Sequence, residues 1–264
     1  MSIWNYLRTI LSALALLCSA LCADAAGRVI YLTFDDGPLS GTANVLDVLA
    51  EEQVPAAMFM VGLHVESGGE QRALLMRAKA LPLVTVGNHS YSHANNHYRD
   101  YYSNTDGVVA DMLKANTVLG LTPWVYARLP GRDVFRLIDY SKDDLSMDPA
   151  HYEREVVDYD YVAAMKFLIY GWDFEWAHSS DGKPVQSVDL LVSEIDHLFA
   201  YGRFMKHNEM ILLMHDEMFQ DRFDGKGKLR NLIQQLKQRG YAFGDIKQYD
   251  PNPYTGISVR SSAK

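Results

Sequence analysis

Six continuous apolar runs, most of them followed by polar or charged residues, alternate along this chain with segments of helical period. The apolar runs predict buried strands over residues 28–34, 56–61, 82–86, 123–127, 167–172 and 209–214. The intervening periodicity predicts helices over residues 43–52, 70–80, 106–119, 160–166, 188–201 and 229–239, with a short final strand over 241–243. Strands that alternate with helices form a parallel sheet covered by helices, and active groups collect at the carboxyl ends of its strands.

Two helix caps and one irregular segment complete this prediction. Thr42 and Asp106 are the expected N-caps of the first and third helices. Residues 133–160 contain nine Asp or Glu residues and have the least regular pattern, so we expect an excursion over one rim of the sheet.

Length and charge restrict the class of protein. The 264 residues suffice for one large core, and a single domain of this length is common among barrels. The formal net charge of −8 argues against nucleic acid or an anionic membrane surface as the main partner. The sequence does not determine the oligomeric state.

The first 25 residues have the features of a secretory signal peptide. Arg8 precedes an apolar stretch over residues 10–22, and Ala23-Asp24-Ala25 forms a cleavage site of small residues. The alternative is an uncleaved anchor, but the stretch is shorter than the roughly 20 residues that a membrane span requires. We therefore expect export to the periplasm or the extracellular space, without stable membrane insertion after cleavage.

Both cysteines lie within this leader. Leucine precedes both Cys18 and Cys22, so neither fits a lipoprotein site. The mature chain is then free of cysteine, which leaves no disulfide, thiol nucleophile or thiolate ligand to consider. The expected organisation is a signal peptide over 1–25, one domain over 26–250 and a loose tail over 251–264.

Two adjacent carboxylates follow the first predicted strand. Asp35 and Asp36 raise each other's pKa unless a positive charge neutralises one of them, and a metal ion would do so. The alternative is a solvated Asp-Gly turn. His89 and His93 are four residues apart, so in a helical turn both project from one face. With Asp36 they would make a two-histidine, one-carboxylate site that leaves a coordination position open, as catalytic zinc sites do.

Hydrolysis at such a site also needs a base and an acid. Asp35 is positioned to act as the base, and His215, at the end of the sixth strand, is positioned to act as the acid. For His215 a satisfied core histidine is the alternative interpretation.

Five segments in this order resemble the motifs of the polysaccharide deacetylase family, also called the NodB-homology or carbohydrate esterase 4 family. The resemblance covers about residues 28–247 and implies a distorted (β/α) barrel of about seven parallel strands. The segments are Thr33-Phe34-Asp35-Asp36-Gly37-Pro38, His89-Ser90-Tyr91-Ser92-His93, Arg128-Leu129-Pro130, Glu175-Trp176 and Leu213-Met214-His215-Asp216.

The resemblance implies a divalent metal, usually zinc, bound by Asp36, His89 and His93. It makes Asp35 the general base, and Arg128 would orient Asp35 and keep it ionised, since a nearby guanidinium lowers a carboxylate pKa.

The same resemblance makes His215 the general acid, steadied by the acid of the fourth motif. Trp176 and Leu213 would line a small pocket for the acetyl methyl group. The metal and a backbone N–H after Arg128 would stabilise the oxyanion.

Two motifs depart from the family pattern. The third usually reads Arg-x-Pro-aromatic-Gly, but Gly131 and Arg132 follow Pro130 here, so the aromatic wall among the substrate contacts is missing. In the fourth, Glu175 replaces the usual Asp. Either Glu175 or Asp173 would then tether His215, and the alignment favours Glu175.

Other polar residues have no expected role in the site. The tyrosine-rich run over 98–102 fits either sugar stacking or a packed loop. We expect a structural or solvent-exposed role for His97, His178, His197 and Asp216, because nothing in the sequence gives them a partner.

The sequence thus predicts an exported, metal-dependent hydrolase that removes acetyl groups from N-acetylated amino sugars of a polysaccharide, either peptidoglycan or chitin-type oligomers. The alternatives are an O-acetyl carbohydrate esterase and a catalytically silent carbohydrate-binding relative. An iron oxygenase shares the ligand types, but its carboxylate normally lies close to the first histidine. Asp36 precedes His89 by 53 positions.

Overall fold

A ten-stranded sheet forms the centre of the computed structural model, which describes residues 27–146 and 149–251. The strand order is β6-β5-β7-β4-β3-β2-β1-β9-β8, with β10 paired to β1. Among the named strand pairs of the described residues, those of β5 with β6 and β7 are antiparallel and the others are parallel. The strands are β1 (Val29–Asp35), β2 (Ala56–Met60), β3 (Val84–Asn88), β4 (Val125–Ala127), β5 (Phe135–Arg136), β6 (Ser141–Lys142), β7 (Phe167–Ile169), β8 (Phe174–Glu175), β9 (Glu209–His215) and β10 (Ala242–Phe243).

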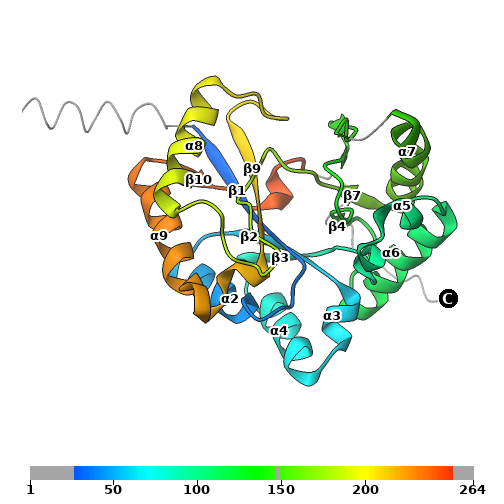
Figure 1. The fold of residues 1–264 in the computed structure, drawn as a ribbon, viewed down its shortest axis with the longest axis horizontal. Coiled ribbons are helices and arrows are strands. Elements are labelled where there is room, and N and C mark those ends of the chain that lie inside the picture. The colour runs from blue at the N-terminus through cyan, green and yellow to red at the C-terminus, as the bar shows by residue number, and fades with distance from the viewer. Residues whose placement is uncertain (1–26, 147–148, 252–264) are drawn as a thin grey trace, which may run out of the picture.

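Helices lie outside the sheet. Helices α2, α8 and α9 lie beside β1 and β10, and α5, α6 and α7 lie beyond β4 and β7 (Figure 1). The helices are α2 (Thr42–Glu52), α3 (Gly62–Glu66), α4 (Gly69–Ala80), α5 (Tyr98–Tyr101), α6 (Thr105–Leu119), α7 (Pro149–Ala164), α8 (Val188–Tyr201) and α9 (Gly225–Gln238). The sheet is curled and rich in parallel pairs, which confirms the predicted α/β fold of (β/α)-barrel type.

Several expected boundaries were wrong. The excursion contains β5, β6 and most of α7, which begins at Pro149 rather than near residue 160. Buried Glu155 of α7 accepts hydrogen bonds from Arg132 at 2.6 and 3.0 Å, and Tyr159 is fully buried. The face that α7 buries is therefore partly polar, which conceals it from hydrophobic periodicity.

Neither expected N-cap holds. Helix α2 begins at Thr42 itself, and the Thr42 hydroxyl hydrogen-bonds Asp216 instead of the helix. Asn104, not Asp106, caps α6 by accepting a hydrogen bond from the Gly107 backbone N–H.

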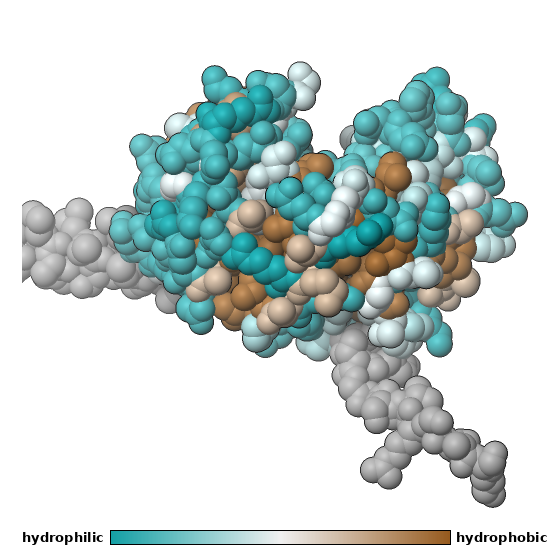
Figure 2. Space-filling view, turned by 90° about the horizontal axis from the view of Figure 1, so that it is seen from below, coloured by the Kyte–Doolittle hydropathy of each residue, from teal (hydrophilic) through white to brown (hydrophobic). Residues whose placement is uncertain are grey.

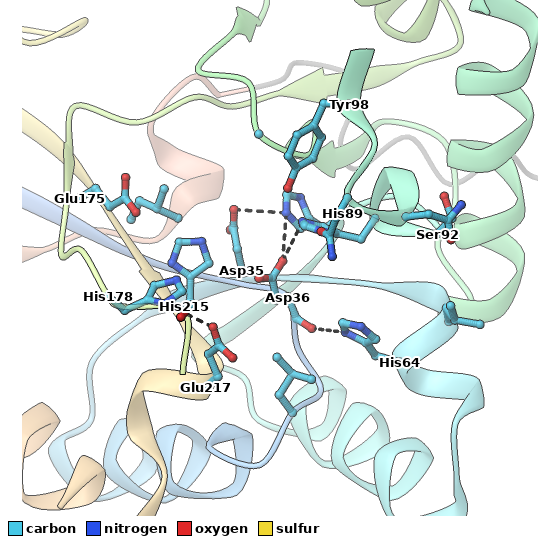
Figure 3. A pocket seen from close by; sticks show the side chains of 18 of the residues that line it. Asp35, Asp36, His64, His89, Ser92, Tyr98, Glu175, His178, His215 and Glu217 are labelled. Carbon is cyan, nitrogen blue, oxygen red and sulfur yellow. Dashed lines mark hydrogen bonds and ion pairs between the residues drawn. The ribbon is translucent and has the colours of Figure 1, made fainter. Parts of the chain in front are cut away.

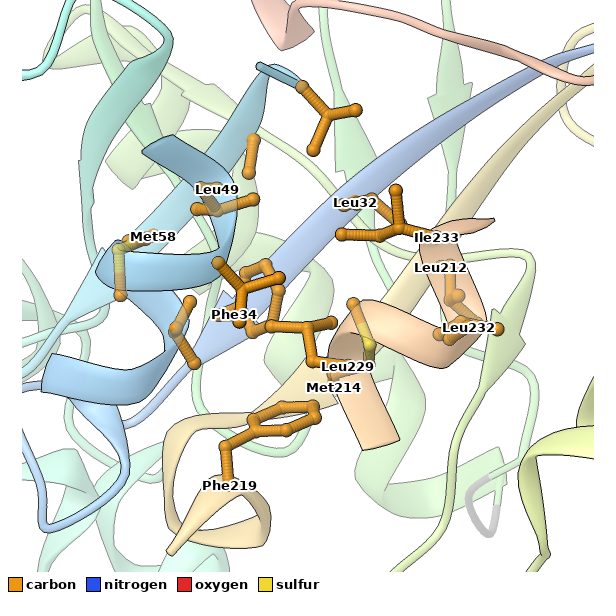
Figure 4. Close-up of a cluster of buried hydrophobic side chains, with 14 of the residues drawn as sticks. Leu32, Phe34, Leu49, Met58, Leu212, Met214, Phe219, Leu229, Leu232 and Ile233 are labelled. Carbon is orange, nitrogen blue, oxygen red and sulfur yellow. The ribbon is translucent and has the colours of Figure 1, made fainter. Parts of the chain in front are cut away.

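The main core lies between the sheet and the helices α2 and α9. Successive residues of a strand point to opposite faces, so Leu32 and Phe34 of β1 enter this core. Thr33 and Asp35 point the other way and both accept hydrogen bonds from Arg128. The same strand thus anchors the core and supports the polar site. Other members are Leu49, Met58, Leu212, Met214, Phe219, Leu229, Leu232 and Ile233 (Figure 4).

Truncating this core should lower the free energy of unfolding. Leu212 is 0% exposed, so we expect Leu212→Ala to cost about 2–5 kcal/mol through lost burial and the cavity left behind. Leu190→Ala on α8, where the side chain is 50% exposed, should cost within about 0.5 kcal/mol. Urea unfolding of both variants measures the difference, and equal midpoints would contradict this packing.

Hydrophilic residues cover much of the face drawn in Figure 2, with apolar patches along its middle. Within the described ranges, no helix combines the length and the apolar character needed to cross a membrane. The predicted leader over 1–25 and the tail beyond Pro251 lie outside the described residues.

Candidate active site

Strand register brings the motif residues to one edge of the sheet. Asp35 of β1 lies opposite His215 of β9. Asn88 of β3 lies opposite Ala127 of β4, so the residues that follow them, His89 and Arg128, are also neighbours. All predicted catalytic and metal-binding residues except Arg128 line an open pocket of about 810 Å³, and Arg128 donates a hydrogen bond to Asp35.

Asp36, His89 and His93 form a compact cluster in this pocket. Their ligand atoms all lie within 4.8 Å of one another. Asp36 Oδ1 is 3.1 Å from His93 Nε2 and 3.4 Å from His89 Nε2 (Figure 3). The structure therefore brings together the three predicted ligands.

The two histidines do not converge through a helical turn, as the spacing argument assumed. His89 directly follows the last residue of β3, and the backbone then turns with positive φ at Ser90 (64°) and His93 (50°). Ser90 Oγ accepts a hydrogen bond from the His93 backbone N–H at 2.9 Å and helps to hold this turn.

Hydrogen bonds on the far side of each ring fix the tautomers. His89 Nδ1 donates to the Arg128 carbonyl at 2.8 Å, and His93 Nδ1 lies 3.0 Å from Asn96 Oδ1. In the neutral rings Nε2 then carries a lone pair toward Asp36 Oδ1. Three electron-rich atoms thus converge and need a shared cation, so the donor set fits a divalent metal.

The charges of the cluster are mutually dependent. Burial alone would raise the pKa of Asp36, but its interactions with His89 and His93 outweigh burial and hold that pKa well below its usual range. Burial opposes the charge on His89, yet the carboxylates of Asp35 and Asp36 raise the pKa of His89. The site therefore favours an ionised Asp36 next to positive charge.

Arg128 is held at every nitrogen and is completely buried. Its Nη1 donates to Asp35 Oδ1 and to Thr33 Oγ1, each at 2.9 Å. Nε and Nη2 donate to the carbonyls of Tyr170 and Gly171 at 3.0 and 2.7 Å. Because Asp35 is the anionic partner of a buried guanidinium, the pair fixes one carboxylate oxygen and leaves Oδ2 at 3.5 Å from His89 Nε2.

His215 lies beside Asp35, but neither predicted acid tethers it. Both oxygens of Asp173 accept backbone hydrogen bonds at 2.8 Å, from Met205 and Ile211. Within residues 27–146 and 149–251, no hydrogen bond joins Glu175 to His215, and burial raises the pKa of Glu175. The expected tether is therefore not formed: Asp173 is occupied by the backbone amides of Met205 and of Ile211 in β9, and Glu175 makes no hydrogen bond to the imidazole within the described residues.

Two of the four predicted substrate contacts line the pocket. Leu213 and Gly131 do so, whereas Pro130 is buried and its carbonyl accepts from the Tyr102 hydroxyl at 2.9 Å. Trp176 is also fully buried, with its ring against Phe219 at 5.9 Å. Trp172 is the tryptophan on the pocket wall.

Tyr98 stands where the third motif lacks its aromatic residue. A side chain on Gly131, which has φ +63°, would meet the Tyr98 ring at 3.2 Å. This ring also packs edge-on against His93 at 5.9 Å, and its hydroxyl points toward the cluster of Asp36, His89 and His93 (Figure 3). Tyr98 thus forms a pocket wall, a role that the sequence left undecided.

Two residues expected to lack partners have them. His178 packs against His215 with ring centroids 4.5 Å apart and lies 3.3 Å from Glu217. Asp216 is fully buried and bonded to Thr42, and burial, with the charges of Asp36 and Asp35, raises its pKa to about 8. The only signal for His178 and Glu217 was that each follows a motif residue by two positions.

Comparisons with known proteins show similarity in sequence and in fold. The sequence model of the family described as polysaccharide deacetylase matches residues 23–138. A chitin disaccharide deacetylase of Vibrio alginolyticus is 24% identical over 309 residues, which cover 86% of this chain and 72% of that protein.

Two solved structures share the fold. A CE4 esterase of Streptococcus mutans has a TM-score of 0.62 and 21% identity, with 84% of this chain and 87% of that chain covered. The catalytic domain of peptidoglycan N-acetylglucosamine deacetylase from Eubacterium rectale has a TM-score of 0.60 and 23% identity, with 85% and 90% covered. The sequence match and the shared fold together confirm the resemblance of this chain to the polysaccharide deacetylase family.

Proposed function

We propose that this chain is a metal-dependent hydrolase that removes N-acetyl groups from amino sugars of a polysaccharide. One observation carries the proposal: the cluster of Asp36, His89 and His93 shares a pocket with Asp35, which is fixed by a buried Arg128. The deacetylase names of the chitin-active and peptidoglycan-active relatives support the reaction and the substrate class.

Asp36, His89 and His93 would hold the metal, for which we propose Zn²⁺. A divalent cation at these ligands supplies Lewis acidity, which acidifies water and stabilises an oxyanion. The hydrogen bonds that Nδ1 of His89 and Nδ1 of His93 make on the far side of each ring keep both Nε2 atoms oriented to bind the metal.

Asp35 and His215 would divide the proton transfers. Asp35, held by Arg128, takes a proton from the attacking water, because its Oδ2 has no bond to Arg128 and faces the pocket. His215, at the end of the neighbouring parallel strand, gives a proton to the leaving amine. The backbone N–H that follows Arg128 would help to stabilise the oxyanion.

The proposed setting is outside the cytoplasm. The leader over 1–25 supports export to the periplasm or the extracellular space, with the domain over 26–250 as the mature enzyme and 251–264 as a tail. An acetylated polysaccharide such as peptidoglycan or a chitin-type oligomer would be the partner there. The net charge of −8 supports a partner other than nucleic acid.

Acetate release tests the proposal directly. The purified protein should release acetate from N-acetylglucosamine oligomers or peptidoglycan, lose this activity after chelation and regain it with Zn²⁺. Activity that survives complete metal removal would contradict the metal mechanism. Acetate released only from O-acetylated xylan would favour an esterase, and glycan binding without acetate release would favour a silent relative.

A further inference from the structure

A tight turn presents His178 to the pocket. His178 pairs with Pro184 in an antiparallel bridge, and the Ser179 N–H donates to the Lys183 carbonyl at 2.9 Å. Gly182, with φ +82°, lets Glu217 approach, since a side chain there would meet Glu217 Cγ at 3.1 Å. The turn therefore seats His178 and Glu217 against each other.

The hydrogen bonds of His178 define which of its ring nitrogens carries the proton. Its Nδ1 lies 2.9 Å from the Ser179 carbonyl and 3.3 Å from Glu217 Oε1. Because both partners are acceptors, Nδ1 carries a proton in the neutral ring and in the cationic ring. Nε2 is then the nitrogen that gains or loses a proton. A carboxylate beside an imidazole favours the charged form of the ring, and Glu217 is the carboxylate that lies beside His178.

His215 differs from His178 in this respect. No carboxylate bonds to it among the described residues, and burial lowers its pKa, although Asp35 and Asp36 oppose this shift. A buried imidazole without an anionic hydrogen bond holds its proton poorly at neutral pH. His178, whose ring lies edge-on to His215 at 4.5 Å, lines the same side of the pocket (Figure 3).

We propose that His178, seated by Glu217, is a second proton-donating residue of this site and shares the protonation of the leaving amine with His215. This inference rests on the proposed deacetylation. As the C–N bond of the tetrahedral intermediate breaks, its electron pair remains on the leaving nitrogen, which takes a proton from an imidazolium N–H. The neutral imidazole then regains a proton from solvent.

Several titratable groups surround His178. Glu217 is its ion-pair partner, Glu175 lies on the same side of the pocket, and His215 lies across the ring contact. Arg222 and Asp181 lie beyond Glu217, and Arg222 Nη2 donates to the Asp181 carbonyl at 2.7 Å. The salt bridge with Glu217 is the closest of these contacts, so Glu217 should dominate.

His178→Asn tests the role with little change in shape, because the amide can replace the Nδ1 donor but cannot titrate. We expect kcat to fall about 10- to 100-fold, a share of what general acids contribute, with KM within about twofold. The basic limb of the kcat–pH profile should move to lower pH, since burial lowers the pKa of His215, the acid that remains. Glu217→Gln should shift the same limb in the same direction with a smaller loss.

Exposed His197 on α8 provides the matched control, and His197→Asn should leave kcat and the profile unchanged. A His178→Asn variant with unchanged kcat, or with an equal loss at every pH, would overturn the proposal.

A second measurement does not depend on catalysis. Imidazole NMR of the Zn²⁺-loaded protein should show that Glu217→Gln lowers the titration midpoint of His178. An unchanged midpoint would overturn the pair. If no substrate releases acetate, the proposed function fails, while the NMR titration still decides whether Glu217 supports a His178 cation.

Discussion

Asp36→Asn should weaken Zn²⁺ binding by at least about 100-fold and remove acetate release with it. The carboxylate is the only anion among the three ligands, and its Oδ1 is the atom on which both imidazoles converge. Loss of an outer-shell partner costs about 10–100-fold in metal affinity or activity, so loss of a direct anionic ligand should reach or exceed that range.

Competition with a chromophoric chelator measures this affinity. Asp106→Asn, the same change at an exposed position in the first turn of α6, should bind Zn²⁺ as the unmodified protein does. Full Zn²⁺ affinity in Asp36→Asn would place the metal elsewhere, and restored activity at high Zn²⁺ would show that binding alone was impaired.

The sequence specified the parts of the fold that depend on apolar burial. Strands β1, β2 and β9 are continuous apolar runs, and α8 spans Val188–Tyr201 as its periodicity predicted. Helix α7 was largely missed because Glu155 and Tyr159 on its buried face are satisfied by hydrogen bonds, including those from Arg132. Hydrophobic periodicity detects apolar burial but not paired polar burial.

The candidate site also has a part that the sequence predicts and a part that it does not. The grouping of Asp36, His89 and His93 follows from parallel register, which a sequence of alternating strands and helices implies. The tether of His215 depends on whether Asp173 is free, and two backbone amides, one in the loop before β9 and one in β9 itself, occupy its carboxylate. No residue pattern encodes those contacts.

His178 illustrates this limit. Its neighbours are brought to it by a turn and by a strand 30 or more residues away in the chain. A single histidine outside the motifs gives no sign of that contact. The proposed second proton donor could therefore be inferred only after the chain was folded.

Asp35→Asn should leave Zn²⁺ affinity within about tenfold but lower kcat by about 10²–10⁴-fold, the usual contribution of a general base. The asparagine Oδ1 can still accept the hydrogen bond from Arg128, which also stays bonded to Thr33 and two carbonyls. The geometry is therefore retained while the proton acceptor is lost. The guanidinium also loses its anionic partner, and breaking a buried pair costs about 3–5 kcal/mol in the free energy of unfolding.

Thr33→Val is the matched control, because it removes a neutral acceptor from the same Arg128 nitrogen and keeps the charge pair. Thr33→Val should lower the free energy of unfolding by about 1 kcal/mol and change kcat little. Metal titration, acetate release and urea unfolding of both variants separate the roles of the two adjacent carboxylates. Asp35 is a base rather than a ligand only if Asp35→Asn keeps the metal that Asp36→Asn loses; equal metal loss in both variants, or full turnover in Asp35→Asn, would reject that division.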